Sequence, residues 1–232
     1  MDKNYKYVFE RSSKEYEDYI KAEIERVNTN GKRTVLMVND TYFPTFDGVT
    51  NVMNMYAEGL IKNGYNVVAY VPAYKGKVYV KSYPVIATKS TFSKKLNYQI
   101  PAFLQDSKTK KWLALLRIDL IHCHSPFQLG HHAVKIHKKR NVPMVSTFHS
   151  QYRKDLEKNI PTQFLVNIAL KYLMQTYNGS DYVLTMTSPC EETLYSYGYK
   201  GITKILTNGT DFVVPENYLL EREEARKKYG VG

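Results

Sequence analysis

Residues 34–61, TVLMVNDTYFPTFDGVTNVMNMYAEGLI, decide the fold of this chain. The first six residues form an almost continuous apolar run with the length of a buried strand, and the loop that follows them ends in Gly48. Apolar residues then recur at helical spacing, which predicts a helix with one apolar face that ends at Gly64. A strand buried on both faces that leads into such a helix is typical of a doubly wound α/β domain.

The turn at Asp47 and Gly48 is the first candidate binding element. Ligands of doubly wound domains bind at the carboxyl ends of the strands, where this turn is expected to lie. Gly48 has no side chain, so a ligand can approach the backbone closely, and the free N–H groups of the following helical turn attract anions. The sequence therefore predicts a phosphate or a sugar phosphate at this turn.

Strand and helix patterns alternate along most of the remaining chain. This order predicts an α/β, Rossmann-like fold, which is a largely parallel sheet with helices on both faces. Strands are expected at residues 66–72, 78–80, 85–86, 118–124, 142–149, 181–187 and 204–206. Helices are expected at residues 12–28, directly before 118, and at 129–140, 164–177, 189–197 and 219–229. Ser188 and Glu191 have the spacing of a capping box for the helix at 189–197.

Three parts of the chain are assigned separately. Ser12 and Glu15 have the spacing of a capping box, and the helix that they begin belongs to an N-terminal helical extension, residues 1–32. Residues 33–214 form the Rossmann-like domain. Residues 215–232 form a charged linker helix.

The net charge of +11 is concentrated in one segment. Residues 62–117 contain eleven lysines and arginines and one acidic residue, Asp106. Such a segment suits an anionic membrane surface, a nucleic acid or an anionic substrate, and a solvated lysine-rich face explains the same charge equally well. Because no element that reads nucleic acid is recognisable, we expect no nucleic-acid partner.

Cysteine content and apolar patterning indicate the compartment. The only two cysteines, Cys123 and Cys190, fall in different predicted elements, which disfavours a disulfide framework. No apolar run is long enough to span a bilayer, and the first ten residues lack the core of a signal peptide. We therefore expect a cytoplasmic protein. The basic segment has the apolar residues Phe92, Leu96, Ile100, Phe103 and Trp112 interleaved, which leaves open an association with an anionic membrane.

Polar residues stand at the predicted junctions between strands and turns, and a parallel sheet would bring them to one edge. Uncharged donors and imidazoles there suit a sugar hydroxyl or a phosphate. Among them, His124 can face the crevice, although a half-buried histidine bonded to a carbonyl explains its position as well. The junction residues are Asp47-Gly48, His122-Cys123-His124, Thr147-Phe148-His149, Ser188 and Asn208-Gly209-Thr210-Asp211.

Several common sites are disfavoured by their missing motifs. The loop after the first strand is not Gly-x-Gly-x-x-Gly, so a nicotinamide dehydrogenase is disfavoured, and neither a P-loop nor a Gly-x-Ser-x-Gly elbow occurs. Beyond a His-x-His pair, the histidines fit no standard zinc spacing, and we predict no metal.

Four segments at the predicted junctions follow one another along the chain, namely FPTFDGVTNVM (43–53), IDLIHCHSPF (118–127), STFHSQY (146–152) and KILTNGTDF (204–212). In this order they resemble motifs of the N-terminal domain of retaining, GT-B fold glycosyltransferases of family 4, and the resemblance covers about residues 34–229. It implies that a sugar is transferred from a nucleotide-sugar to an acceptor hydroxyl with retention and without a cofactor.

The resemblance also implies roles for individual residues. The amides of Gly48 and Val49 would face the donor diphosphate, and His124 would be the catalytic residue that lines the reaction centre. The leaving phosphate would receive the acceptor proton, so no side-chain base is required. The residues implied for the acceptor pocket are Asp47, Thr147, His149 and Tyr152, and those implied for a cleft between two domains are Asn208, Gly209 and Asp211.

This sequence departs from the family pattern in two places. Asp47-Gly48 stands where the family has paired glycines, and Thr207 replaces the proline before Asn208. In the family, the segment equivalent to residues 221–230 leads into a second domain that supplies most nucleotide-sugar contacts. We therefore expect this chain alone to be inactive.

The sequence leaves the acceptor open between a lipid and a soluble glycan. Residues 149–159, HSQYRKDLEKN, are similar to the corresponding loop of the diacylglycerol glucosyltransferases, which favours a lipid. The alternative from another functional class is a non-catalytic basic module that binds an anionic membrane or a nucleic acid through residues 62–117.

Overall fold

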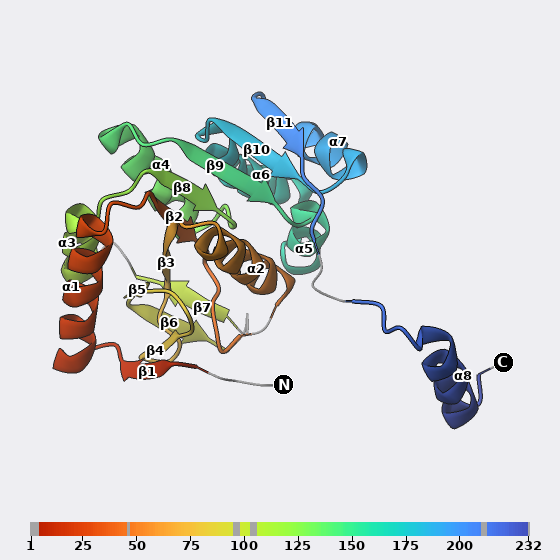
Figure 1. Ribbon diagram of the computed structural model, residues 1–232. Helices are drawn as coiled ribbons and strands as arrows, with labels where there is room; N and C mark the ends of the chain where they lie inside the picture. The colour runs from red at the N-terminus through yellow and green to blue at the C-terminus, as the bar shows by residue number, and fades with distance from the viewer. Residues whose placement is uncertain (1–4, 46, 95–97, 103–105, 210–212, 232) are drawn as a thin grey trace.

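The computed structural model describes residues 5–45, 47–94, 98–102, 106–209 and 213–231. Its centre is a sheet of seven parallel strands in the order β11-β10-β9-β8-β2-β3-β5 (Figure 1). The strands are β2 (Thr34–Val38), β3 (Asn66–Pro72), β5 (Val85–Thr88), β8 (Leu120–Cys123), β9 (Met144–Phe148), β10 (Tyr182–Thr185) and β11 (Ile202–Ile205).

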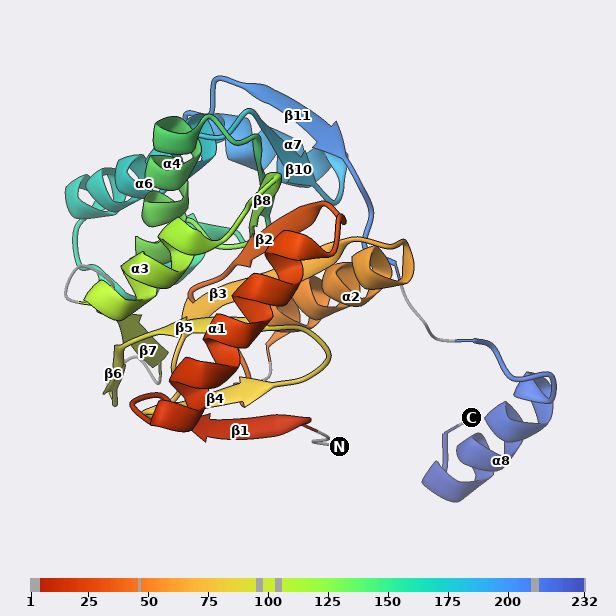
Figure 2. The ribbon, with the colours of Figure 1, turned by 60° about the vertical axis from the view of Figure 1, so that its left-hand side comes forward.

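Burial of the central strands explains their continuous apolar runs. Every residue of β2, β3 and β9 is buried, as expected for a parallel sheet covered on both faces. Right-handed crossovers place α2 (Gly48–Lys62) on one face and both α4 (Gln128–Arg140) and α6 (Gln163–Asn178) on the other (Figures 1 and 2). The predicted α/β, Rossmann-like architecture is therefore confirmed.

Smaller elements surround this sheet. Two antiparallel pairs join β1 (Tyr7–Glu10) to β4 (Lys77–Val80) and β6 (Ser90–Ser93) to β7 (Tyr98–Pro101). The remaining helices are α1 (Lys14–Thr29), α3 (Ser107–Leu115), α5 (Tyr152–Asn159), α7 (Ser188–Ser196) and α8 (Tyr218–Tyr229). Helix α8 has no buried residue and stands away from the domain (Figure 1).

The structure corrects two predicted helix caps. Ser13, not Ser12, caps α1, because its hydroxyl accepts the Tyr16 amide at 3.1 Å. Thr187, not Ser188, caps α7, because its hydroxyl accepts the Cys190 amide at 3.4 Å. In both cases the residue with extended backbone geometry is the neighbour of the residue chosen from the sequence pattern.

The N-terminal helix packs on the domain. Tyr16, Ile20, Ile24 and Val27 of α1 belong to the same buried cluster as the central strands. The Tyr16 hydroxyl donates to the Val85 carbonyl and accepts the amide of Ala87, both at 2.8 Å. Helix α1 also lies beside α3 (Figures 1 and 2). The domain boundary at residue 33 stays a prediction.

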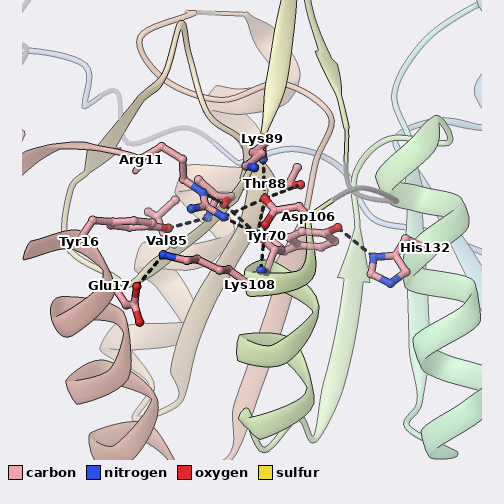
Figure 3. Close-up of polar contacts among 12 residues, drawn as sticks. Arg11, Tyr16, Glu17, Tyr70, Val85, Thr88, Lys89, Asp106, Lys108 and His132 are labelled. Atoms are coloured by element: carbon pink, nitrogen blue, oxygen red, sulfur yellow. Dashed lines mark hydrogen bonds and ion pairs between the residues drawn. The ribbon is translucent and has the colours of Figure 1, made fainter. Parts of the chain in front are cut away.

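A buried ion pair fastens the N-terminal segment to the rest of the fold (Figure 3). Arg11 and Asp106 are 6% and 1% exposed, and the Arg11 Nη2 atom lies 2.8 Å from the Asp106 Oδ2 atom. Arg11 also donates to the Thr109 hydroxyl and to the Ala87 carbonyl. The pair therefore ties together the turn before α1, strand β5 and the start of α3.

The hydrogen bonds around Asp106 keep its carboxylate charged. Burial alone would raise the pKa of Asp106, but the Lys89 amide, which donates at 2.8 Å, and the Arg11 guanidinium outweigh it and lower the pKa below its ordinary value. The only acidic residue of the basic segment is thus an internal structural group.

We predict that Asp106→Asn destabilises the protein by about 3–5 kcal/mol at neutral pH, because it leaves a buried guanidinium without its counter-charge. Urea unfolding monitored by circular dichroism measures this loss. Because the pKa is lowered in the folded state, the ionic contribution is present above about pH 4 and is lost as the pH falls through the lowered pKa.

The matched control is Asp18→Asn, which breaks the exposed ion pair between Lys14 and Asp18 on α1. Exposed pairs contribute about 0–1 kcal/mol, so this variant should unfold close to the wild type. An Asp106→Asn variant no less stable than the control would contradict the structural role of the buried pair.

Candidate functional site

The carboxyl ends of strands β2, β8 and β9 meet in the middle of the sheet edge. Strand β8 pairs with β2 on one side and with β9 on the other, and its residue Cys123 is opposite both Val38 and Ser146. The segments that leave these three strands are therefore neighbours. This confirms that the junctions at His122–His124 and Thr147–His149 converge at one edge, as the sequence predicts.

Three histidines form a cluster at these strand ends. The Nε2 atom of His122 lies 2.7 Å from the Thr147 hydroxyl, and the Nδ1 atom of His124 lies 3.1 Å from the His149 Nε2 atom. The rings of His124 and His149 are stacked, with centroids 5.3 Å apart. The rings of Tyr56 on α2 and of His122 pack edge to face, with their centroids 5.2 Å apart. The cluster thus links α2 with the ends of two strands.

Burial keeps these imidazoles neutral. It lowers the pKa of His122 to about 3 and that of His124 well below the ordinary value, in both cases with help from neighbouring histidines. It also lowers the pKa of His149 to about 4, although the nearby Asp47 carboxylate acts in the opposite direction. A neutral imidazole offers one hydrogen-bond donor and one acceptor.

His124 has an unused polar atom in this environment. The residue is 0% exposed, and its Nε2 atom is buried without a hydrogen-bond partner among the described residues. A buried nitrogen without a hydrogen bond costs free energy, and a ligand that forms a hydrogen bond with it would remove that cost. This atom belongs to a side chain that lines the largest cavity described below.

Asp40 is a residue of the site that the sequence interpretation missed. It lies two residues after the end of β2, and its carboxylate accepts the Ser125 hydroxyl at 2.6 Å and the Leu129 amide at 3.0 Å. Burial raises the pKa of Asp40 to about 6, although these two hydrogen bonds act to lower it. Asp40 therefore joins the ends of β2 and β8 to the start of α4. The sequence signal for Asp40 was an acidic residue directly after the almost continuous apolar run at residues 34–39.

A cavity of about 720 Å³ opens beside this cluster. Its polar wall includes Asp40, Asp47 and His124, whereas Thr147 and His149, which the resemblance placed in the acceptor pocket, are not part of its lining. Thr147 is buried behind His122 and contacts the site through that ring. The other polar lining residues are Asn39, Thr41, Ser125, Gln128, Ser150, Asp155 and Asn159. The apolar and aromatic lining residues are Val49, Tyr98, Ile100, Pro101, Phe127, Tyr152, Leu156, Ile160, Tyr172 and Leu173.

The predicted diphosphate turn begins α2. Asp47 is the N-cap of this helix, and its carboxylate accepts the Thr50 amide at 2.7 Å. The extra carboxylate thus has a local structural partner. No atom lies within 4 Å of the position that a side chain on Gly48 would occupy, so the backbone is open to a ligand. The roles of Gly48 and Val49 toward a diphosphate stay predictions.

A second cavity of about 480 Å³ lies between α2 and the segment that follows β11. Asn208 and Gly209, two of the residues assigned to an interdomain cleft, line it together with Tyr56. Asp211, the third, lies outside the described residues. Tyr56 therefore separates this cavity from the histidine cluster.

The basic segment, residues 62–117, does not present all its apolar residues to solvent. Trp112 is 3% exposed and lies under the Arg11 guanidinium at 4.8 Å, so the expectation that it is interleaved in a membrane-facing surface is wrong. Lys108 is paired with Glu17 at 2.7 Å. Leu96 and Phe103 lie outside the described residues.

Among the described residues, none of the helices combines the length and the hydropathy that a membrane span requires. The same part of the chain contains no group of three or more histidine, cysteine, aspartate or glutamate side chains placed to hold a metal ion.

We predict that His122 and His149 titrate far below a free histidine, with midpoints near 3 and 4. Their ring proton shifts, followed by NMR, should stay constant from pH 8 to 6. Because folding lowers both pKa values, the unfolded state binds more protons than the folded state between about pH 6.5 and the lowered pKa values. The protein therefore loses stability as the pH falls through that range. A midpoint near 6.5 for either ring would contradict its burial.

Comparison with known proteins agrees with this geometry. A curated relative, alpha-monoglucosyldiacylglycerol synthase of Streptococcus pneumoniae, is 24% identical over 200 residues, which are 84% of this chain and 45% of the relative. The chain thus spans less than half the length of that relative.

Among solved structures, sucrose-phosphate synthase from Thermosynechococcus elongatus superposes with a TM-score of 0.58 at 15% identity, over 87% of this chain and 53% of that one. This likeness shows the fold, the Rossmann-like half of a GT-B architecture. The family model of Glycosyltransferase Family 4 matches residues 46–213, which include the turn at Asp47, the histidine cluster and the segment after β11. Because this match spans most of the chain, the chain belongs to Glycosyltransferase Family 4.

Proposed function

We propose that this chain is the acceptor-binding half of a retaining glycosyltransferase that transfers a sugar from a nucleotide-sugar to the hydroxyl of a membrane lipid. The observation that carries the proposal is the 720 Å³ cavity, whose lining combines polar residues around His124 with an apolar and aromatic half.

The distribution of polar groups favours a lipid over a glycan acceptor. A glycan presents hydroxyls on all sides and needs many donors and acceptors around it. A diacylglycerol presents one hydroxyl on two acyl chains. The apolar and aromatic half of the lining residues, which includes Leu156 and Leu173, suits the acyl chains, and the polar residues around His124 suit the hydroxyl. The name of the curated relative, alpha-monoglucosyldiacylglycerol synthase, supports the same acceptor class.

The proposed chemistry uses positioned hydrogen bonds and no side-chain base. The neutral His124 ring can donate to, or accept from, a hydroxyl of the transferred sugar without adding charge. Both acids near His124 already accept hydrogen bonds, Asp40 from Ser125 and Leu129 and Asp47 from the Thr50 amide, so we assign them structural roles and not the role of a base. The acceptor proton would then pass to the leaving phosphate, and preorganised donors would stabilise the developing charge.

The donor would bind between this chain and a second domain. The Gly48 and Val49 amides would face its diphosphate at the positive end of α2. Asn208 and Gly209 would border the cleft, beside the second cavity. Because the chain spans less than half of its relative, we expect most nucleotide-sugar contacts to lie outside it and the chain alone to be inactive.

We predict that the full-length protein, supplied with a panel of radiolabelled nucleotide-sugars and detergent-dispersed diacylglycerol, forms a glycolipid. His124→Ala should lower kcat by roughly 10²–10³-fold, the usual loss when one positioned transition-state donor is removed. Thin-layer chromatography of the lipid extract measures the product, and thermal unfolding checks that the variant is folded.

The matched control is His137→Ala, a histidine near the C-terminal end of α4 that is bonded to the Val142 carbonyl away from the cavity. It should leave turnover near that of the wild type. If His124→Ala has the kcat of the wild type, His124 does not have the catalytic role proposed for it. Transfer to soluble sugars with no transfer to the lipid would overturn the proposed acceptor.

A further inference from the structure

Helix α6 exposes an apolar surface that the fold of this chain does not cover. Phe164, Leu165, Ile168 and Tyr172 are 72%, 46%, 49% and 45% exposed. Their spacing places them within one side of the helix, which we call the outer face of α6. The opposite side is the buried one and packs into the smaller core through Val166, Leu170, Leu173, Met174 and Tyr177. Helix α6 is therefore apolar on two sides. On the outer face, the ring of Tyr172 contacts that of His131 on α4, with centroids 4.1 Å apart, whereas Phe164, Leu165 and Ile168 remain exposed.

The charges around the outer face are predominantly positive. Helix α6 contains no acidic residue, and its only charged side chain, Lys171, is exposed. Helix α5 packs against α6 and carries Arg153, Lys154 and Lys158. The two acids of α5 are already paired, Asp155 with Lys158 at 3.2 Å and Glu157 with Arg153 at 3.9 Å. Lys154 and Lys171 form no ion pair with a described residue, which leaves a net positive rim.

The outer face borders the proposed acceptor cavity. Tyr172 belongs to both, since its ring is exposed on α6 and also lines the cavity. Leu156 and Ile160, from α5 and the residue that ends it, also line the cavity, together with Asp155 and Asn159. A lipid that approached along the outer face of α6 would thus reach the cavity at Tyr172.

A lipid bilayer fits this surface better than a second copy of the chain. In a two-fold dimer the same faces meet, and a face with unpaired cations and no unpaired acid would bring like charges together. An apolar helix face with a basic rim is instead the pattern of helices that lie in the interface of anionic membranes. Exposed apolar patches of this kind mark interaction sites.

We infer that the outer face of α6 docks onto an anionic lipid bilayer, with Phe164, Leu165 and Ile168 inserted at the headgroup boundary and the cavity mouth held at the membrane surface. This inference rests on the proposed lipid acceptor. It places the membrane contact on α6 and α5, and not on the basic segment at residues 62–117.

The test is co-sedimentation of the protein with vesicles of phosphatidylcholine and phosphatidylglycerol. The double variant Phe164→Gln/Ile168→Gln should lower the partition coefficient by about tenfold or more, because two inserted apolar side chains are lost. Vesicles of phosphatidylcholine alone should bind the wild type more weakly. The matched control is Ile202→Gln on β11, an isoleucine that is 73% exposed on another element and should bind like the wild type.

A fluorescent variant reports the insertion directly. The only tryptophan, Trp112, is buried in the core, so Phe164→Trp adds one exposed reporter. Its emission should shift to shorter wavelength on anionic vesicles and be quenched by brominated acyl chains, whereas Ile202→Trp should show neither effect. Unchanged emission of Phe164→Trp, or unchanged sedimentation of the double variant, would overturn the docking surface.

The remaining outcomes separate this inference from the proposed function. A dimer in analytical ultracentrifugation that the double variant dissociates, with vesicle binding retained, would assign the face to a second copy and overturn the inference. Loss of vesicle binding in the double variant, combined with no glycolipid product from the full-length wild type, would uphold the docking surface and overturn the lipid acceptor.

Discussion

The position of β8 between β2 and β9, buried on both faces of a parallel sheet, is the constraint on which the site depends. It draws polar side chains at the strand end into the interior, where each must find a partner. His122 finds Thr147, and Ser125 finds Asp40. The same burial lowers the pKa of all three histidines. The Nε2 atom of His124 is the exception, because the described residues give it no partner, and it belongs to the residue at the polar end of the cavity.

The fold could be predicted because its central strands are apolar throughout. The patterns at residues 34–39 and 66–72 each predict a strand that the structure contains. The order of the strands in the sheet could not be predicted, because no pattern in the sequence says which strands pair. Helix α5 could not be predicted in this way, because Tyr152 is its only buried residue and its sequence has no apolar period. The strands β6 and β7, with the sequences STFS and YQIP, could not be predicted, because neither contains a continuous apolar run.

Within the site, residue types could be predicted but contacts could not. The sequence and its family resemblance identified His124, His149 and Asp47, whereas the stacking of the two histidines and the capping role of Asp47 depend on backbone geometry. Charge was a weaker guide than exposure. The basic segment drew attention to a membrane contact at Trp112, which lies in the core, while the exposed apolar residues are on α6. A net charge describes the attraction of a surface and does not say which residues form it.

The central claim is that the cavity beside His124 holds the acyl chains and hydroxyl of a lipid acceptor. Photo-crosslinking of the full-length protein with a diacylglycerol that carries a diazirine on one acyl chain, followed by peptide mass spectrometry, tests this most directly. We expect labels on the apolar part of the lining, at Leu156, Ile160 or Leu173, and we expect that excess unlabelled diacylglycerol prevents this labelling by competition. Labels confined to other surfaces, or labels at the cavity that excess diacylglycerol does not remove, would contradict it.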